Sequence, residues 1–320
     1  MLTRRSVIAA GLLAPIAARA QPVPATVRII SPFPAGGSSD AVARLLQPGL
    51  RQRLGTTVVV ENRPGASASI GATLVARAPP DGATWLLAAD SFVVSSLLMK
   101  DLPYDVQKDF EPVTMVARGA MVLCTSAARS YRTLADVVAA AKAAPGTLTY
   151  ATTGIGSNGH LTVAAVSQIT GARLVHVPYR GVAPAANDAL AGHVDLIISS
   201  TASLAPFIES GQFRALVQCG EQRAAFLPDT PTAVESGIAN FHAYSWFGFF
   251  APAATPKPVI DRFYRDVAAT AREPGTADIL VNKYRVELAL PTPDELRATI
   301  AEELPFWGKI IRDNNIKNET

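Results

Sequence analysis

The chain has 320 residues, 49% of them hydrophobic and 17% charged, with 29 Lys and Arg against 26 Asp and Glu. Three of the basic residues, Arg4, Arg5 and Arg19, lie in the first twenty positions, so the rest of the chain carries 26 residues of each sign. A balanced chain without a basic run or an interleaved aromatic patch argues against nucleic acid as a partner, and any selectivity for anions must be local.

The N-terminal segment has the pattern of a signal peptide. A basic pair, Arg4 and Arg5, precedes an apolar run from Val7 to Ala18, and an Ala-Arg-Ala ending predicts cleavage before Gln21. The run is too short to be a membrane anchor, since a span needs about 20 apolar residues. We therefore expect a periplasmic protein, and the arginine pair leaves twin-arginine and general export both open.

After this segment the chain begins with two strand–loop–helix units and a further strand. Apolar patterns predict strands at 27–30, 57–60 and 84–88 and helices at 39–54 and 70–77. Because the order is β-α-β-α-β, we expect a parallel sheet that takes a ligand at the carboxyl ends of its strands. Asp90 and Ser91 follow the third strand at that edge.

A second α/β unit begins near Ser126, after an apolar strand pair from Val113 to Thr125 that is broken at Arg118-Gly119. Its predicted helices are 134–143, 159–170, 183–191 and 202–209, and its predicted strands are 147–151, 174–177, 194–199 and 213–218. A strand at 245–251 and helices at 258–272 and 293–314 follow. The chain thus contains two α/β units, and its C-terminal part is expected to return to the first unit. This order indicates two lobes with a cleft between them, where a small ligand would bind.

Cys124 and Cys219 both lie in predicted strands. In an oxidising compartment a disulfide between them is possible, and two buried thiols are equally compatible with the sequence.

Three loops share one pattern, a β-branched run followed by small residues and then Ser or Asn where a helix begins. They are Ser31–Asp40, Glu61–Ile70 and Tyr150–His160. Such loops let a ligand approach the backbone and present unpaired amides at the positive end of a helix dipole, so they suit an anion.

The segment Gly154–Gly159 also matches the GxGxxG pattern of dinucleotide-binding proteins, between a strand and a helix. The acidic residue that holds the ribose is missing, but Arg180 could meet a 2′-phosphate, so an NADP-binding oxidoreductase stays an alternative. A second alternative is that these glycines bind nothing and serve only to form a tight turn. An exported hydrolase would use Ser157 with His160, although no GxSxG elbow surrounds the serine.

The remaining polar residues indicate no metal site. The histidines at 160, 176, 193 and 242 lack metal-ligand spacing, so turn or core roles are expected for them. Asp195 either closes the cleft or orients a neighbouring turn. Asp40, in the first turn of its helix, is expected to stabilise the helix end rather than to contact an anion.

Six motifs, in this order, resemble the Bug family, the TctC-like extracytoplasmic solute receptors of tripartite tricarboxylate transporters. They are Pro32–Asp40, Glu61–Ala66, Leu102–Asp105 with Asp109-Phe110, Gly154–Ser157 with His160, Pro178–Gly181, and Ser245–Gly248 with Ala251-Pro252. The resemblance covers essentially the whole chain after the signal peptide, and six ordered motifs are much more specific than any one of them.

The resemblance implies an α/β periplasmic-binding-protein fold, two α/β lobes joined by crossing strands with a ligand cleft between them. The expected limits are 1–20 for the signal peptide, 21–122 plus 246–320 for lobe 1, and 123–245 for lobe 2. The resemblance also implies that the protein has no catalytic activity and binds no cofactor. A monomer would capture a small carboxylate by lobe closure and deliver it to membrane transporter subunits, or serve a sensor kinase.

The resemblance also implies which residues hold the carboxylate, largely through backbone amides and ordered water. These are Phe33, Ala35, Gly36, Ser38, Ala66, Ser67, Ser91, Thr153, Gly156, Ser157 and Asn158, with Tyr179 and Asp195 on the far wall. Ser67 and Phe92 stand where many relatives have smaller residues. We therefore expect a compact or partly apolar carboxylate rather than citrate.

Overall fold

The computed structural model describes residues 24–66, 68–99 and 101–317. The predicted signal peptide, its cleavage before Gln21 and the predicted ligand residue Ser67 lie outside these ranges. No helix within them is both long enough and apolar enough to cross a membrane.

Lobe 1 is built on a mixed sheet, in which three parallel strands at the N-terminus are followed by antiparallel pairing of the third with a later strand. Its N-terminal elements are β1 (Thr26–Ser31), α1 (Ser38–Leu54), β2 (Thr57–Asn62), α2 (Ser69–Ala76), β3 (Thr84–Ala89) and α3 (Asp90–Leu98). Strand β1 pairs in parallel with β2 on one side and β3 on the other, so the carboxyl ends of all three lie at one edge. Helices α1 and α2 begin at that edge, as the two predicted β-α units require, and so does α3, which the sequence did not predict.

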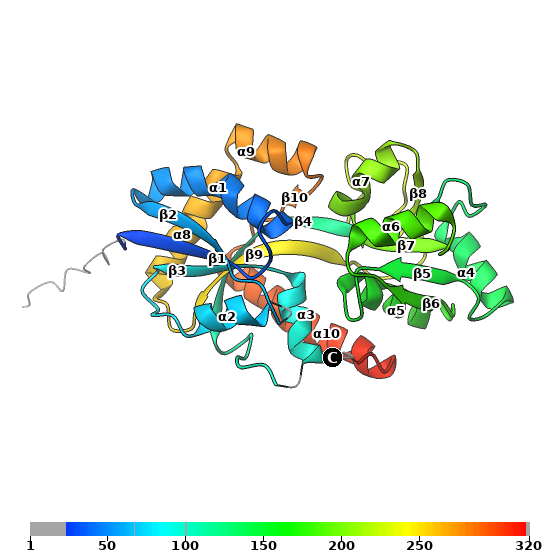
Figure 1. Cartoon of the computed structure of the whole chain (residues 1–320), viewed down its shortest axis with the longest axis horizontal. Coiled ribbons are helices and arrows are strands. Elements are labelled where there is room, and N and C mark those ends of the chain that lie inside the picture. Colours follow the sequence, from blue (N-terminus) through cyan, green and yellow to red (C-terminus); the bar gives the residue numbers. More distant parts are fainter. Residues whose placement is uncertain (1–23, 67, 100, 318–320) are drawn as a thin grey trace, which may run out of the picture.

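Two long strands, β4 (Phe110–Ser126) and β9 (Tyr244–Pro252), cross between the lobes (Figure 1). Residues Phe110–Ala120 of β4 pair with β9, and Met121–Ser126 pair with β7 and β8 of lobe 2. The predicted break at Arg118-Gly119 is wrong, because both residues stay in the ladder opposite β9. Strand β4 is continuous and changes partners after Ala120. The lobe limits at 122/123 and 245/246 remain our proposal, since these strands belong to both lobes.

Lobe 2 repeats the α/β arrangement. Its elements are α4 (Leu134–Ala143), β5 (Thr149–Thr152), α5 (Asn158–Thr170), β6 (Val175–Pro178), α6 (Val182–Ala191), β7 (Leu196–Ser200), α7 (Thr201–Glu209) and β8 (Phe213–Gln218). Strands β6, β5 and β7 are parallel neighbours, and the carboxyl ends of β5 and β7 face lobe 1. The two lobes and their crossing strands confirm the expected fold.

The C-terminal segment returns to lobe 1 and then runs beneath both lobes. It contains α8 (Lys257–Ala271), α9 (Pro274–Asp278), a single π-helical turn (Ile279–Lys283), β10 (Glu287–Leu288) and α10 (Pro293–Asp313). Helix α8 covers the sheet through Phe263, whose ring stacks on Trp85 at 3.8 Å. Helix α10 packs on α3 of lobe 1 and α5 of lobe 2, where Trp307 and Ile310 join the lobe 2 core.

The two cysteines are free and buried. Cys124 belongs to the apolar cluster on one face of the lobe 2 sheet and Cys219 to the cluster on the opposite face, so their thiols do not meet. Burial raises the pKa of the Cys219 thiol to about 12. Both therefore act as small core side chains.

Candidate ligand-binding site

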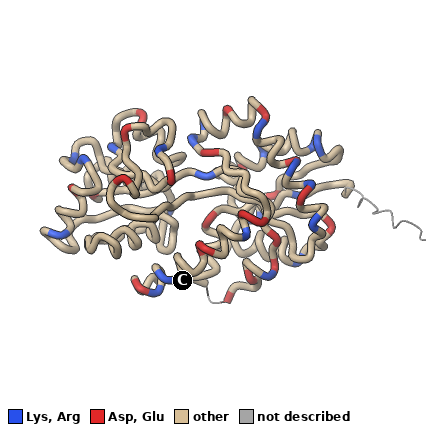
Figure 2. The backbone as a smooth tube through the Cα atoms, turned by 180° about the vertical axis from the view of Figure 1, so that it is seen from behind, with Lys and Arg blue, Asp and Glu red and all other residues tan. Residues whose placement is uncertain are grey.

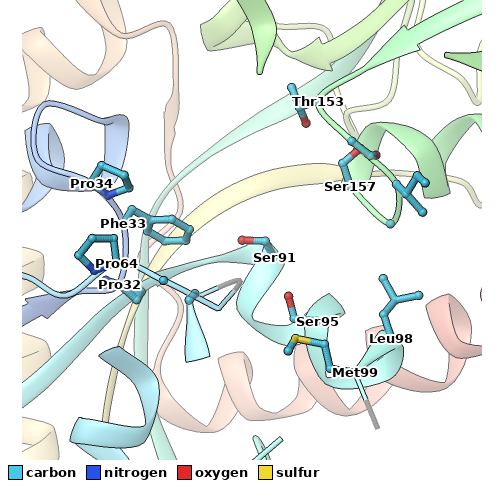
Figure 3. A pocket seen from close by; sticks show the side chains of 15 residues that line it. Pro32, Phe33, Pro34, Pro64, Ser91, Ser95, Leu98, Met99, Thr153 and Ser157 are labelled. Carbon is cyan, nitrogen blue, oxygen red and sulfur yellow. The ribbon is translucent and has the colours of Figure 1, made fainter. Parts of the chain in front are cut away.

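A cavity of about 420 Å³ opens between the lobes, at the carboxyl edges of both sheets (Figure 3). Lobe 1 supplies the loop after β1, the loop after β2 and one side of α3, and lobe 2 supplies the loop after β5. The lining residues are Pro32, Phe33, Pro34, Pro64, Gly65, Ala68, Ser91, Ser95, Leu98, Met99 and Thr153 to Ser157. We call this the interlobe cavity.

The loop after β1 is held in place by its own helix. The Gly36 amide donates to Asp40 Oδ2 at 2.9 Å, and the Arg44 guanidinium bonds the same carboxylate at 3.0 Å. The hydrogen bond from Arg44 lowers the pKa of Asp40 to about 2. Asn62 Nδ2 donates to the Phe33 carbonyl at 3.2 Å. Asp40 thus orders the loop before its helix, whereas the sequence predicted that it stabilises the helix end, and Asn62 holds the backbone of Phe33 at the cavity wall.

The loop after β2 has a strained backbone. Ala66 and Ala68 adopt φ values of 44° and 76°, in the left-handed region that favours glycine. Such conformations cost about 1–3 kcal/mol each and are often found at ligand sites. Ala68 lines the cavity and is the N-cap of α2, so one of the two strained residues lies at the site itself.

The loop after β5 depends on a histidine beneath it. The Gly156 amide donates to His160 Nδ1 at 3.1 Å, and the Ser157 hydroxyl caps α5 by accepting from the His160 amide. His160 stacks on His176 at 3.8 Å, and Thr152 Oγ1 lies 2.7 Å from His176 Nε2. Burial lowers the pKa of both histidines to about 4. His160 is therefore neutral at pH 7 and can accept the Gly156 amide hydrogen.

The two lobes meet at a buried seam beside the cavity. Asn158 Nδ2, at the start of α5, donates to Asp90 Oδ2 at 3.0 Å and to the Tyr244 carbonyl at 2.7 Å. Ser245 Oγ donates to Asp90 Oδ1 at 2.9 Å. Burial raises the pKa of Asp90, and these donors oppose that rise. One carboxylate thus joins α3, α5 and β9 at the base of the cleft.

The interlobe cavity contains hydroxyls but no formal charge among the residues that line it. Within the described part of the chain, the side chains of Ser91, Ser95 and Thr153 form no hydrogen bond to protein. Ser157 Oγ instead donates to the Gly154 carbonyl at 2.8 Å. Figure 3 shows Ser91 and Ser95 on the lobe 1 side of the cavity and Thr153 and Ser157 on the lobe 2 side, with the Ser91 hydroxyl directed towards Phe33 and with Leu98 and Met99 below. The site therefore offers neutral donors beside apolar walls.

The structure brings together part of the residue set predicted from the sequence. Phe33, Ser91, Thr153, Gly156 and Ser157 line the interlobe cavity, whereas Gly36 and Ser38 line a second cavity. Ala35 and Ala66 are exposed and line neither. Ser95, Leu98 and Met99 were not predicted, because α3 was not recognised as a helix. The four-residue spacing of Ser91 and Ser95 would have placed both hydroxyls on one face of such a helix.

Three predicted residues have other roles. The Asn158 side-chain amide donates to Asp90 in the seam between the lobes. Tyr179 Oη donates to Asp188 Oδ2 at 2.7 Å. Asp195 precedes β7, at the amino end of the strand, where its carboxylate accepts from the Thr149 amide at 2.9 Å and pairs with Arg129 at 3.0 Å. The alternative role for Asp195, orienting a neighbouring turn, fits this position. The cleft lies at the opposite edge of the sheet.

Comparison with known proteins gives matches over nearly the whole chain. The family model described as "Tripartite tricarboxylate transporter family receptor" matches residues 42–316. Protein BugT of Bordetella pertussis is 35% identical over 313 residues, which cover 96% of this chain and 94% of BugT. A UPF0065 protein from the tcbD-tcbE intergenic region of Pseudomonas sp. (strain P51) is 35% identical over 283 residues, covering 88% and 84% of the two chains.

Solved structures of periplasmic binding proteins also match this fold over nearly the whole chain. The periplasmic binding protein BugD has a TM-score of 0.75 at 33% identity, with 91% of this chain and 98% of that chain covered. Rpa4515 of R. palustris with adipate has a TM-score of 0.78 at 29% identity and the same coverage. MatC from Rhodopseudomonas palustris with bound malate has a TM-score of 0.74 at 26% identity, covering 89% and 98%.

Replacement of Asn158 by alanine is expected to destabilise the protein by about 1–3 kcal/mol, because it leaves a buried carboxylate and a carbonyl each short of a donor. The free energy of unfolding in urea would measure this loss. Asn282→Ala is the matched control, since Asn282 donates to Asp278 on an exposed helix surface at 2.7 Å. Equal losses in the two variants would contradict the role given to Asn158.

Acidification is expected to lower the free energy of unfolding through His160 and His176. Their folded-state pKa values of about 4 lie below the ordinary value of 6.5, so between these values the unfolded chain binds protons that the folded chain does not. The histidine contribution is complete above pH 6.5 and is lost as the pH falls towards 4. Glu303 acts in the opposite sense, since burial, together with the charge of Asp90, raises its pKa to about 7.

A comparison of variants separates these two effects. Urea denaturation at about pH 8 and about pH 4.5 would be measured for the wild type and for the double variant His160→Gln, His176→Gln. Glutamine keeps a hydrogen-bonding group but does not titrate, so we expect the double variant to lose less stability on acidification. An equal loss in both proteins would show that the histidine pair does not exclude protons.

Proposed function

The chain belongs to the TctC family of tripartite tricarboxylate transporter receptors, and we propose that its interlobe cavity captures a small carboxylate in the periplasm for delivery to a membrane transporter. Family membership agrees with the six sequence motifs. The ligand contacts we propose are Ser91 and Ser95 of lobe 1, Thr153 and Ser157 of lobe 2, and the ring of Phe33.

The observation that carries this proposal is that both lobes line the cavity with hydroxyls, of which those of Ser91, Ser95 and Thr153 have no protein partner among the residues that the structure describes. A carboxylate has two oxygens and can accept from both lobes at once. A ligand that bridges the lobes binds their closed arrangement more tightly than an open one, and this difference in affinity shifts the population towards closure. A membrane partner could then distinguish the loaded receptor by its shape.

An anion can be held here without a formal cation. Helix α3 begins one residue before Ser91, and helix α5 begins one residue after Ser157. The first amides of a helix have no intrahelical partner and lie at the positive end of its dipole. Neutral donors that are already oriented bind an anion well where water is excluded. The apolar walls, including Leu98 and Met99, favour a partly apolar carboxylate.

The geometry gives less support to NADP binding. The Gly156 amide, which the dinucleotide pattern would offer to a pyrophosphate, is occupied by His160 Nδ1. A Cβ at Gly156 would collide with the Leu98 side chain, so this glycine allows lobe 1 to approach the loop. We propose a monomeric receptor without catalytic activity or a cofactor, serving either a transporter or a sensor kinase.

A thermal-shift screen of residues 21–320 tests the proposed function. The panel contains mono-, di- and tricarboxylates, aromatic acids, amino acids, NADP and uncharged controls. At a concentration 100 times the dissociation constant, a ligand stabilises the folded state by about 2.7 kcal/mol, a rise in melting temperature of about 2–8 °C. We expect a rise with one class of carboxylate. A rise with NADP alone would contradict the proposal.

A further inference from the structure

A second cavity, of about 380 Å³, lies between the lobes on the side of α1 and α7. Figure 1 shows these two helices on the same side of the crossing strands, with β10 between them. The polar side chains that line it come from both lobes: Ser38, Ser200, Ser203, Ser245, Lys283 and Tyr284. Val42, Phe247 and Val286 provide apolar walls.

This cavity adjoins the interlobe cavity at two places. Pro34 lines the interlobe cavity and Gly36 the second cavity, so their walls contain residues two positions apart in one loop. Two residues span at most about 7 Å. Ser91 lines the interlobe cavity, and its neighbour Asp90 accepts a hydrogen bond of 2.9 Å from Ser245, which lines the second cavity. The two cavities therefore lie side by side between the lobes.

Lys283 is the one charged residue among the described residues that line either cavity. It ends the π-helical turn, is exposed, and forms no ion pair with any residue that the structure describes. Of the acidic residues near that turn, Asp278 accepts a hydrogen bond from Asn282, and two others are in ion pairs. Glu209 pairs with Arg285 at 2.7 Å, and Glu287 pairs with Arg118 at 3.3 Å. The ammonium group of Lys283 is thus available to an anionic ligand.

We propose that the ligand is a dicarboxylate and that Lys283 is the residue that selects its second carboxylate. This inference rests on the proposed function, which places the first carboxylate on the hydroxyls of the interlobe cavity. The methylene chain passes the apolar walls, and the second carboxylate meets the ammonium of Lys283, whose long flexible side chain can follow ligands of different length. The hydroxyls of Ser200 and Tyr284 lie in the same cavity.

The test compares each diacid with the monoacid of the same chain length: succinate with butyrate, glutarate with pentanoate, and adipate with hexanoate. Dissociation constants would be measured by calorimetry for the wild type, Lys283→Met and Lys283→Arg. Lys142→Met is the control, because Lys142 is on α4, away from both cavities. We expect the wild type to prefer one diacid and Lys283→Met to bind it about five- to tenfold more weakly, with monoacid affinity unchanged.

The outcomes separate this inference from the proposed function. Lys283→Arg, which keeps the charge, and Lys142→Met should retain the preference for the diacid. If Lys283→Met keeps that preference, or weakens the monoacid and the diacid equally, Lys283 does not select the second carboxylate, although the receptor function stands. If the wild type binds no carboxylate, the proposed function fails, and the role of Lys283 fails with it.

Discussion

The buried carboxylate of Asp90 is the interaction on which the arrangement of the site depends. A buried charge is costly unless donors surround it, and here the donors come from Asn158 of lobe 2 and Ser245 of a crossing strand. Satisfying Asp90 therefore fixes the starts of α3 and α5 against each other. Ser91, which follows Asp90 in sequence, and Ser157, which precedes Asn158, are thereby brought to opposite walls of one cavity.

This arrangement explains how a protein with balanced charge can recognise an anion. Among the residues that the structure describes, Lys/Arg and Asp/Glu are interspersed along the backbone of both lobes, without a long stretch of one sign (Figure 2). Selectivity must then come from local geometry, which the loops after β1 and β5 supply. Each loop is ordered by a side chain of its own helix, Asp40 or His160, so the hydroxyls and amides at the cavity need little rearrangement when a ligand binds.

Much of the fold could be predicted from the sequence, because β-branched runs and small-residue loops alternate regularly. The loop pattern predicted an anion site, and the family resemblance predicted Thr153 and Ser157 within it. The sequence did not reveal α3, whose apolar residues surround the helix and lack an amphipathic pattern. Nor could local pattern show that Asn158 faces a buried carboxylate 68 positions away, or that Asp195 lies at the amino end of β7. Those facts depend on strand order, which only the folded chain displays.

The central claim is that hydroxyls from both lobes hold the ligand carboxylate. Calorimetry with the most stabilising carboxylate tests it directly, on Ser91→Ala, Thr153→Ala and the double variant. Ser96→Ala is the control, since its hydroxyl donates to the Val93 carbonyl at 2.6 Å within α3. We expect each site variant to weaken binding about tenfold or more, because a hydrogen bond to a charged group is lost. Unchanged affinity in the double variant would contradict the account.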